Sequence, residues 1–127
     1  MKTGERKAET GQVDYRQRTF AFAARIVRFV ESLPNSATNR ALGNQLLRAA
    51  TSVGANARAA KRARSRAEFA AKMGIVEEEV DESSYWIELL VALKKAKREK
   101  VRLLLEEADE ILAITIASIK TTRRNAA

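Results

Sequence analysis

The sequence has no cysteine and no histidine among its 127 residues. Without cysteine the chain has no disulfide framework and no thiolate chemistry. Without histidine it lacks the commonest general base and the commonest zinc ligand. Its single proline and five glycines supply few of the turns that a many-stranded β fold requires. These absences favour a helical protein and give no support to a catalytic or zinc site.

Long hydrophobic runs are also missing. No stretch approaches the roughly 18–20 apolar residues that cross a bilayer, and the first residues lack the short apolar core of a signal peptide. We therefore expect a cytoplasmic protein with no membrane partner. Hydrophobic residues nevertheless make up 46% of the chain, which is enough for one domain of this length to bury a single core.

Positive charge exceeds negative charge in this chain. There are 24 Lys and Arg residues against 16 Asp and Glu residues, so the formal net charge is +8. A balance of this kind favours a polyanionic partner such as RNA or DNA. The alternative is that the excess charge only keeps the protein soluble.

Apolar residues recur three or four positions apart in four segments, which predicts four amphipathic helices. Asp14 is a suitable N-cap for the first helix, and Pro34 prevents that helix from continuing. Ser36 or Thr38 caps the second helix. The predicted helices cover residues 14–32, about 38–60, about 66–96 and 101–121, with the last turn between helices at 97–100.

Four helices with short connections predict an all-α fold, an up-down-up-down antiparallel four-helix bundle. We assign residues 13–122 to this bundle. Residues 1–12 are polar and contain two glycines, so we expect a flexible N-terminal tail there. Residues 123–127 form a basic C-terminal tail.

The third predicted helix has the most regular pattern. Ser65 and Glu68 form a capping box at its start. Residues spaced 4-3-4-3-4-3 form the stripe that faces the partner helices, namely Phe69, Met73, Val76, Val80, Ser83, Ile87 and Leu90. A second line is acidic at mid-helix and apolar at Trp86, Leu89 and Leu93. This second apolar face predicts an oligomer interface, and the alternative is a wide core face covered by the neighbouring helix.

The second helix carries small residues along one face, including Gly43, Ala50, Gly54 and Ala57. A glycine costs roughly 1 kcal/mol relative to alanine inside a helix. We therefore expect another helix to come unusually close to this face. Asn56 lies on the neighbouring apolar line, and we expect its amide to bond a protein group and to help fix the packing register.

An aromatic stripe marks the first helix, where Phe22, Ile26, Phe29 and Leu33 share one line. Arginines occupy much of the remaining surface of this helix. A stripe at helical spacing is more typical of a core than of a platform for stacked bases, so we assign it to the core.

Antiparallel topology brings two basic clusters to opposite ends of the bundle. The first, here called the arginine end, comprises Arg58, Lys61, Arg62, Arg64 and Arg66. The second, here called the lysine end, comprises Lys94, Lys95, Lys97, Arg98 and Lys100, and Arg102 continues the same cluster into the fourth helix. Such side chains can contact a phosphate backbone. The alternative is that they stabilise helix dipoles or are simply solvated. No helix-turn-helix spacing or RNA-binding aromatic signature indicates sequence-specific readout.

Between these ends the third helix carries the carboxylates of Glu77, Glu78, Glu79, Asp81 and Glu82. Di-iron bundles combine carboxylates with histidine, which this chain lacks. We expect the carboxylates to be solvated or paired with arginines of the next helix. Nothing orders the Ser, Lys and Glu residues into a nucleophile–base pair. We therefore predict no catalytic residue, no metal site and no cofactor.

Six runs of sequence carry a family resemblance. They are SATNRALGNQLLR at 36–48, TSVGAN at 51–56, RARSRAEF at 62–69, KMGI at 72–75, EEVDE at 78–82 and YWIELL at 85–90. They resemble the bacterial four-helix-bundle protein family, also called the 23S rRNA intervening-sequence protein family, over about Arg16 to Ile119. Relatives usually carry a glutamate where this chain has Ala59, so no role that needs a carboxylate beside Asn56 is expected.

The resemblance also implies partners. Some relatives look like the accessory proteins of diversity-generating retroelements, which form barrel-shaped pentamers and associate with a reverse transcriptase and nucleic acid. Other relatives are encoded in intervening sequences of ribosomal RNA genes. We therefore expect a non-catalytic homo-oligomer, a pentamer by resemblance. It would bind RNA or DNA, or a nucleic-acid enzyme such as a reverse transcriptase, through its basic ends. The alternative is a structural protein–protein interaction module that binds no nucleic acid.

Overall fold

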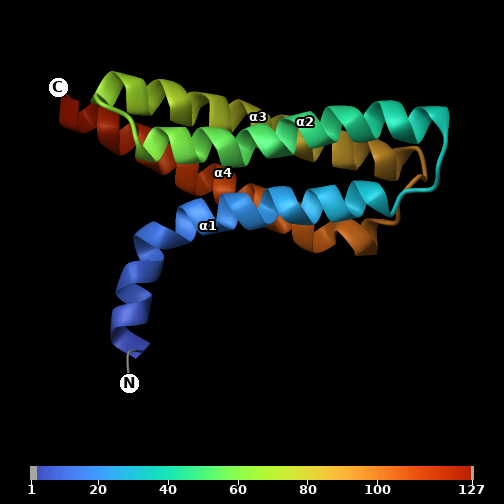
Figure 1. The fold of residues 1–127 in the computed structure, drawn as a ribbon, viewed down its shortest axis with the longest axis horizontal. Coiled ribbons are helices and arrows are strands. Elements are labelled where there is room, and N and C mark those ends of the chain that lie inside the picture. Colours follow the sequence, from blue (N-terminus) through green and yellow to red (C-terminus); the bar gives the residue numbers. More distant parts are fainter. Residues whose placement is uncertain (1–2, 127) are drawn as a thin grey trace.

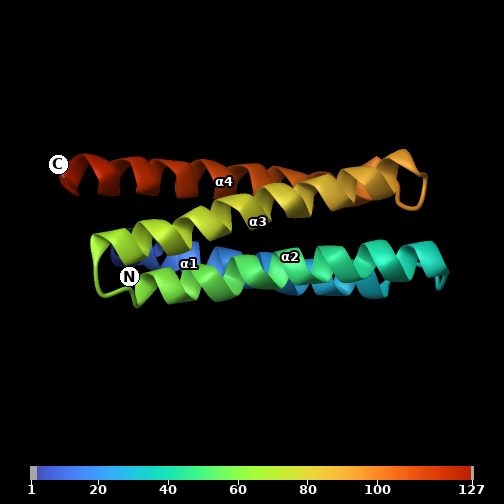
Figure 2. The same cartoon turned by 90° about the horizontal axis from the view of Figure 1, so that it is seen from above.

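The computed structural model describes the backbone of residues 3–126 and the side chains of residues 15–125. It contains four helices in chain order, α1 (Thr3–Glu31), α2 (Ala37–Lys61), α3 (Arg66–Ala92) and α4 (Arg98–Ala126). They run alternately in opposite directions along the long axis (Figure 1). The view from above places α3 between α2 and α4 (Figure 2). The predicted antiparallel four-helix bundle is confirmed.

The core is formed by the apolar stripes that the spacing predicted. On α3 the inward residues are Met73, Val76, Val80, Ser83, Ile87 and Leu90, and all six are buried. Phe22 and Ile26 of α1 and Leu46 of α2 are fully buried in the same core. Burial of each such side chain stabilises the fold by about 1.5–3 kcal/mol. Helix periodicity therefore identified the core correctly on α3.

The predicted close approach to α2 is confirmed, and the approaching helix is α1. A Cβ atom added at Gly43 would lie 2.9 Å from Cγ1 of Val30. At Gly54 the added atom would lie 3.5 Å from the carbonyl oxygen of Thr19. The small side chains of α2 thus let the two backbones pack closely.

The contact between α1 and α4 is the least extensive of the four between neighbouring helices, and polar side chains strengthen it. Arg18 of α1 forms two bonds with Glu107 of α4, from Nε to Oε2 at 2.9 Å and from Nη2 to Oε1 at 2.8 Å. Such bidentate pairs are directional and strong. The hydroxyl of Tyr15 lies 2.8 Å from Oγ1 of Thr115, and burial raises the pKa of Tyr15.

The two predicted serine caps are confirmed. Oγ of Ser36 accepts from the backbone N–H of Asn39 at 3.0 Å, and Oγ of Ser65 accepts from the backbone N–H of Glu68 at 3.0 Å. The carboxylate of Glu68 reaches back to the N–H of Arg64 at 2.7 Å. At the starts of α2 and α3, side chains therefore satisfy some of the backbone amides that have no partner within the helix.

The end of α3 was predicted wrongly. The helix stops at Ala92, and the connection to α4 occupies residues 93–97 instead of 97–100. Lys94 has φ of 62°, and the N–H of Lys95 donates to the carbonyl of Leu90 at 2.8 Å. This is a Schellman ending, which usually has glycine at the left-handed position. Because lysine occupies that position here, no residue type in this segment indicates the helix end.

Both termini are more helical than predicted. Helix α1 begins at Thr3 instead of near Asp14, and α4 continues to Ala126 instead of stopping near Thr121. No proline interrupts either segment, and glycine weakens a helix by only about 1 kcal/mol without ending it. The prediction of a flexible tail at residues 1–12 falls on residues whose side chains the structure does not describe. Residues 1, 2 and 127 lie outside the described part altogether.

A matched pair of glycine substitutions tests the close packing of α1 on α2. Both Gly43 and Gly74 lie inside helices, where alanine is favoured by about 0.8–1.0 kcal/mol. A Cβ at Gly74 meets no atom within 4 Å. We expect Gly74→Ala to raise the free energy of unfolding, measured in urea, by about 1 kcal/mol. Gly43→Ala should lower it, because the stiff side chain of Val30 must move. An equal gain from both variants would contradict the packing described.

Candidate functional site

The arginine end lies where α2 ends and α3 begins, and all five of its side chains are exposed. The last turn of α4, with Arg123 and Arg124, reaches the same end of the bundle (Figure 1). The structure therefore brings these residues together as the antiparallel topology predicted.

A shallow depression marks the arginine end. Arg58, Arg62 and Arg64 line it, and its one carboxylate is that of Glu68. That carboxylate is already bonded to the backbone N–H of Arg64. Ala59 also lines the depression and contributes no charge. The depression is consequently cationic.

Arg66 differs from the other members of this end. Its Nη1 donates to the backbone carbonyl of Asn125 at 2.6 Å. The bond joins the start of α3 to the last turn of α4, where a cation also stabilises the negative end of the helix dipole. Arg66 therefore has a structural role that the sequence did not indicate.

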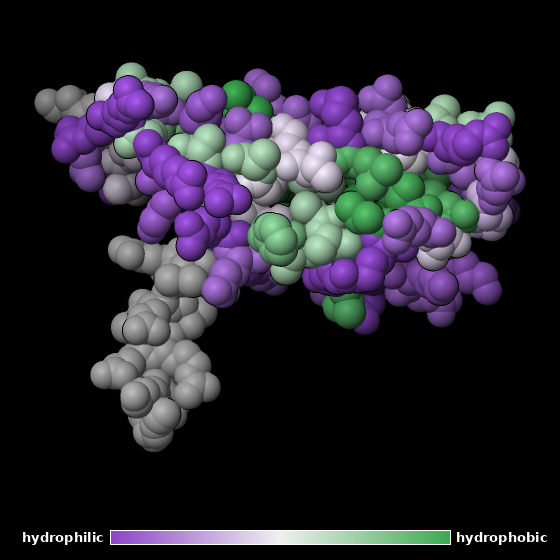
Figure 3. All heavy atoms as spheres, in the orientation of Figure 1, coloured by the Kyte–Doolittle hydropathy of each residue, from purple (hydrophilic) through white to green (hydrophobic). Residues whose placement is uncertain are grey.

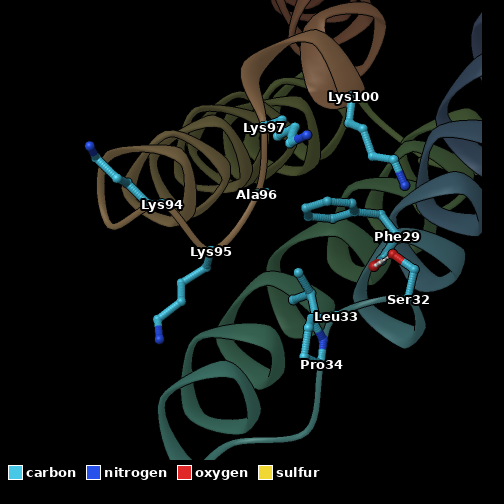
Figure 4. A pocket seen from close by; sticks show the side chains of 9 residues that line it. All are labelled: Phe29, Ser32, Leu33, Pro34, Lys94, Lys95, Ala96, Lys97 and Lys100. Atoms are coloured by element: carbon cyan, nitrogen blue, oxygen red, sulfur yellow. Dashed lines mark hydrogen bonds between the residues drawn. The ribbon is translucent and has the colours of Figure 1, made fainter.

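The lysine end lies at the opposite end of the bundle, where the α3–α4 connection passes beside the α1–α2 connection (Figure 1). All five of its side chains are exposed. Its four lysines line a hollow of about 380 Å³. The remaining lining is mostly apolar and includes Phe29, Leu33 and Pro34 (Figure 4).

The ion pairs between described residues include none of the ten cations of the two basic ends, but Arg102, which the sequence placed next to the lysine end, does pair with Glu106. These pairs are Arg18–Glu107, Arg18–Glu110, Arg48–Glu79, Arg48–Glu82 and Arg102–Glu106. None of the ten cations of the two ends pairs with a carboxylate within the side chains that the structure describes. Arg66 donates to the carbonyl of Asn125; the charges of the other nine are available to a partner such as a phosphate group.

Two of the five acidic residues of α3 form the expected ion pairs with an arginine of a neighbouring helix. Glu79 and Glu82 pair with Arg48 of α2, and the indole N–H of Trp86 donates to Oε2 of Glu82 at 3.0 Å. The pKa of Glu82 is lowered, first by the bond from Trp86 and then by Arg48. Arg48 was not singled out from the sequence, because nothing local identifies a partner 31 residues away.

No group of three or more Cys, His, Asp or Glu side chains is arranged to hold a metal ion in the described part of the chain. None of its helices is long and apolar enough to cross a membrane. Asn56 is only half-buried and donates to the carbonyl oxygen and the hydroxyl of Ser52, both at 3.0 Å. The expected hydrogen bond therefore exists, but it stays within α2 and fixes no register between helices.

The residues predicted to form an oligomer interface are covered to different degrees. Trp86 is half-buried against the core, Leu89 is half-buried and Leu93 is 48% exposed. Tyr85, which is 56% exposed, lies edge-on to Trp86 with ring centroids 5.0 Å apart. A single chain therefore partly covers Trp86 and Leu89 but leaves Tyr85 and Leu93 in contact with solvent.

A different apolar surface lies along the junction of α1 and α2. In Figure 3 hydrophobic residues gather along this junction, and hydrophilic residues occupy the ends of the bundle. Phe20 of α1 is 73% exposed beside Arg16, Gly54 and Arg58. Phe20 lies outside the aromatic stripe that the sequence assigns to the core, and its exposure was not predicted.

Comparison with protein families identifies the chain. The profile of the 23S rRNA-intervening sequence proteins matches residues 11–117. The chain belongs to this family. It is also 36% identical to a protein of unknown function from the S23 ribosomal protein family of Bacteroides thetaiotaomicron, known from a crystal structure. The TM-score is 0.79, and the match covers 84% of this chain and 98% of the other. A comparison with curated proteins gave no match.

The pair formed by Glu82 and Trp86 predicts a pH-dependent signal. A lowered carboxyl pKa stabilises the fold above the ordinary value of 4.5, and this contribution is lost as the pH falls through the lowered pKa. Trp86 is the sole tryptophan, so its fluorescence should change with a midpoint below 4.5. In Glu82→Gln that transition should disappear. A transition that persists unchanged in Glu82→Gln would show that another group controls the indole.

Proposed function

We propose that the protein is a non-catalytic homo-oligomeric scaffold. It binds the backbone of RNA or DNA, or an enzyme that acts on nucleic acid, through its two basic ends. The observation that carries this proposal is the exposure of ten cations at the two ends with no carboxylate partner within the described side chains. Cations placed in this way gain free energy by releasing counterions from a phosphate backbone.

The shape of the ends supports backbone contact. The basic clusters lie at helix ends and in the connections between helices, where they can contact a phosphate backbone without placing a helix in a groove. The family to which the chain belongs is named for intervening sequences of 23S rRNA, which is consistent with RNA as a partner. Reverse transcriptase and the pentameric state enter the proposal through the resemblance alone.

Exposed apolar side chains favour a second candidate, a protein–protein interaction module. Tyr85 of α3 is 56% exposed, and Leu93, directly after the end of α3, is 48% exposed. In this alternative the positive charge serves solubility and the apolar side chains bind the partner. The two candidates differ in their response to salt, because only phosphate contacts weaken steeply with ionic strength.

Neutralising the arginine end tests the first candidate. We expect Arg62→Gln/Arg64→Gln to weaken binding to single-stranded and structured RNA or DNA at low salt. The slope of log K against log salt should fall by about 0.7–0.9 for each phosphate that the variant no longer touches. Fluorescence anisotropy at several salt concentrations measures both quantities.

A control variant separates local contact from net charge. Gln45 and Ala113 are exposed inside α2 and α4, so Gln45→Glu/Ala113→Glu changes the net charge equally but away from the ends. This control should keep most of the salt slope of the parent protein. Equal weakening in both double variants would show that binding depends on net charge and not on the arginine end. No binding by the parent protein at low salt would exclude the nucleic-acid candidate.

A second pair of variants tests the self-association part of the proposal. Trp86 packs against the core of its own chain, so its replacement would disturb folding and assembly together. Leu93→Gln changes a half-exposed side chain beyond the end of α3. We expect it to shift the mass measured by light scattering towards the monomer with little change in melting temperature. Leu103→Gln alters a leucine of α4 that is 57% exposed and should leave the mass unchanged. A monomeric parent protein would contradict the proposal directly.

A further inference from the structure

The hollow at the lysine end combines two kinds of surface. Phe29, Leu33 and Pro34 come from the end of α1 and the α1–α2 connection, and Ala96 comes from the α3–α4 connection. The four lysines of the lysine end surround this apolar surface, and no carboxylate lines it. Figure 4 shows the ring of Phe29 projecting into the space between Lys100 and Leu33. A ligand that fits both surfaces must carry an apolar group and negative charge together.

Local structure holds this lining in place. Pro34 fixes the backbone of the α1–α2 connection, and Asn39 donates to the carbonyl of Pro34 at 2.7 Å. The Schellman bonds at Lys94 and Lys95 fix the other connection. Oγ of Ser32 donates to the carbonyl of Phe29 at 2.6 Å, so this hydroxyl proton is already used. The hollow is therefore formed before a ligand arrives, which lowers the entropy cost of binding.

The size and chemistry fit one nucleotide of a strand. Small-molecule sites range from about 300 to 1,000 Å³, and a hollow of about 380 Å³ is large enough for one small group. An aromatic ring beside cations is the arrangement that binds single strands without sequence preference, since the ring stacks on a base and the cations contact phosphates. A base in a duplex cannot offer its face in this way.

The two basic ends differ in this respect. The depression at the arginine end is lined by cations, two alanines and one carboxylate, with no aromatic ring. It offers phosphate contacts to single and double strands alike. The lysine end combines a ring, an apolar lining and four lysines in one hollow. The exposed ring of Phe20 also lies beside Arg58 of the arginine end, but on the side of the bundle and outside the depression at that end.

We infer that the hollow at the lysine end holds one unpaired base of a single strand against Phe29, while its lysines contact the flanking phosphates. This inference rests on the proposed function and extends it. The arginine end contributes general affinity, and the lysine end makes the protein prefer single-stranded over double-stranded nucleic acid.

The first test uses the unaltered protein. An oligothymidine and an abasic strand of the same length carry equal charge and differ in their bases. Stacking of one base corresponds to roughly a 5- to 100-fold gain in affinity, so the abasic strand should bind weaker by that factor. Equal binding of the two strands, with normal salt dependence, would overturn the base site and leave the proposed function intact. No binding of either strand would overturn both. A free nucleoside monophosphate that binds as tightly as the strand would overturn the assignment to a strand.

The second test assigns the base to the hollow. Phe29→Leu keeps an apolar side chain but removes the ring, and we expect single-strand affinity to fall roughly 5- to 100-fold while duplex affinity changes less than about twofold. Phe20→Leu is the matched control, because Phe20 is an exposed ring of the same helix outside the hollow. Thermal unfolding confirms that each variant folds. If Phe20→Leu weakens single-strand binding and Phe29→Leu leaves it unchanged, the base lies at the α1–α2 junction and the inference is wrong.

Discussion

Each of the four helices has one apolar stripe that must leave water, and the antiparallel bundle buries all four stripes in one core. This burial constrains everything else in the molecule. It directs Phe22, Ile26, Leu46 and Ile87 inwards, where they are fully buried. It also sends the connections and helix termini to the two ends, where cations remain in water. The close packing of α1 on α2 at Gly43 belongs to the same requirement.

Charge is then divided by position along the bundle. On its sides, opposite charges meet across neighbouring helices, as Arg18 does with Glu107 and Arg48 with Glu82. At the ends the clusters of Lys and Arg meet no described carboxylate partner. Surface ion pairs contribute only about 0–1 kcal/mol each to stability, and among the cations of the two ends only Arg66 has a structural bond described above, to the carbonyl of Asn125. The ends are consequently the part of the surface whose composition a function must explain.

Much of this arrangement follows from the sequence. The four helices, the serine caps, the α3 stripe and the two basic ends could be predicted, because each depends on spacing or on local capping. The end of α3 could not, since Lys94 takes a left-handed conformation that normally identifies glycine. The pairing of Arg48 with Glu79 and the exposure of Phe29 at the hollow depend on which helices become neighbours. Periodicity placed Phe29 in the core stripe, and the half-buried Phe29 does pack against the core, while its remaining surface lines the hollow.

We propose that nucleic acid contacts the ends of the bundle and not its sides. The most direct measurement is photo-crosslinking of the unaltered protein to an oligonucleotide carrying photoreactive bases, with the adducts located by mass spectrometry. Contact at the ends predicts adducts within residues 58–66 and 94–100 and within residues 29–34, which line the hollow, and the disappearance of these adducts at high salt. Adducts concentrated on the α1–α2 junction or on the acidic side of α3, with the ends unmodified, would contradict it.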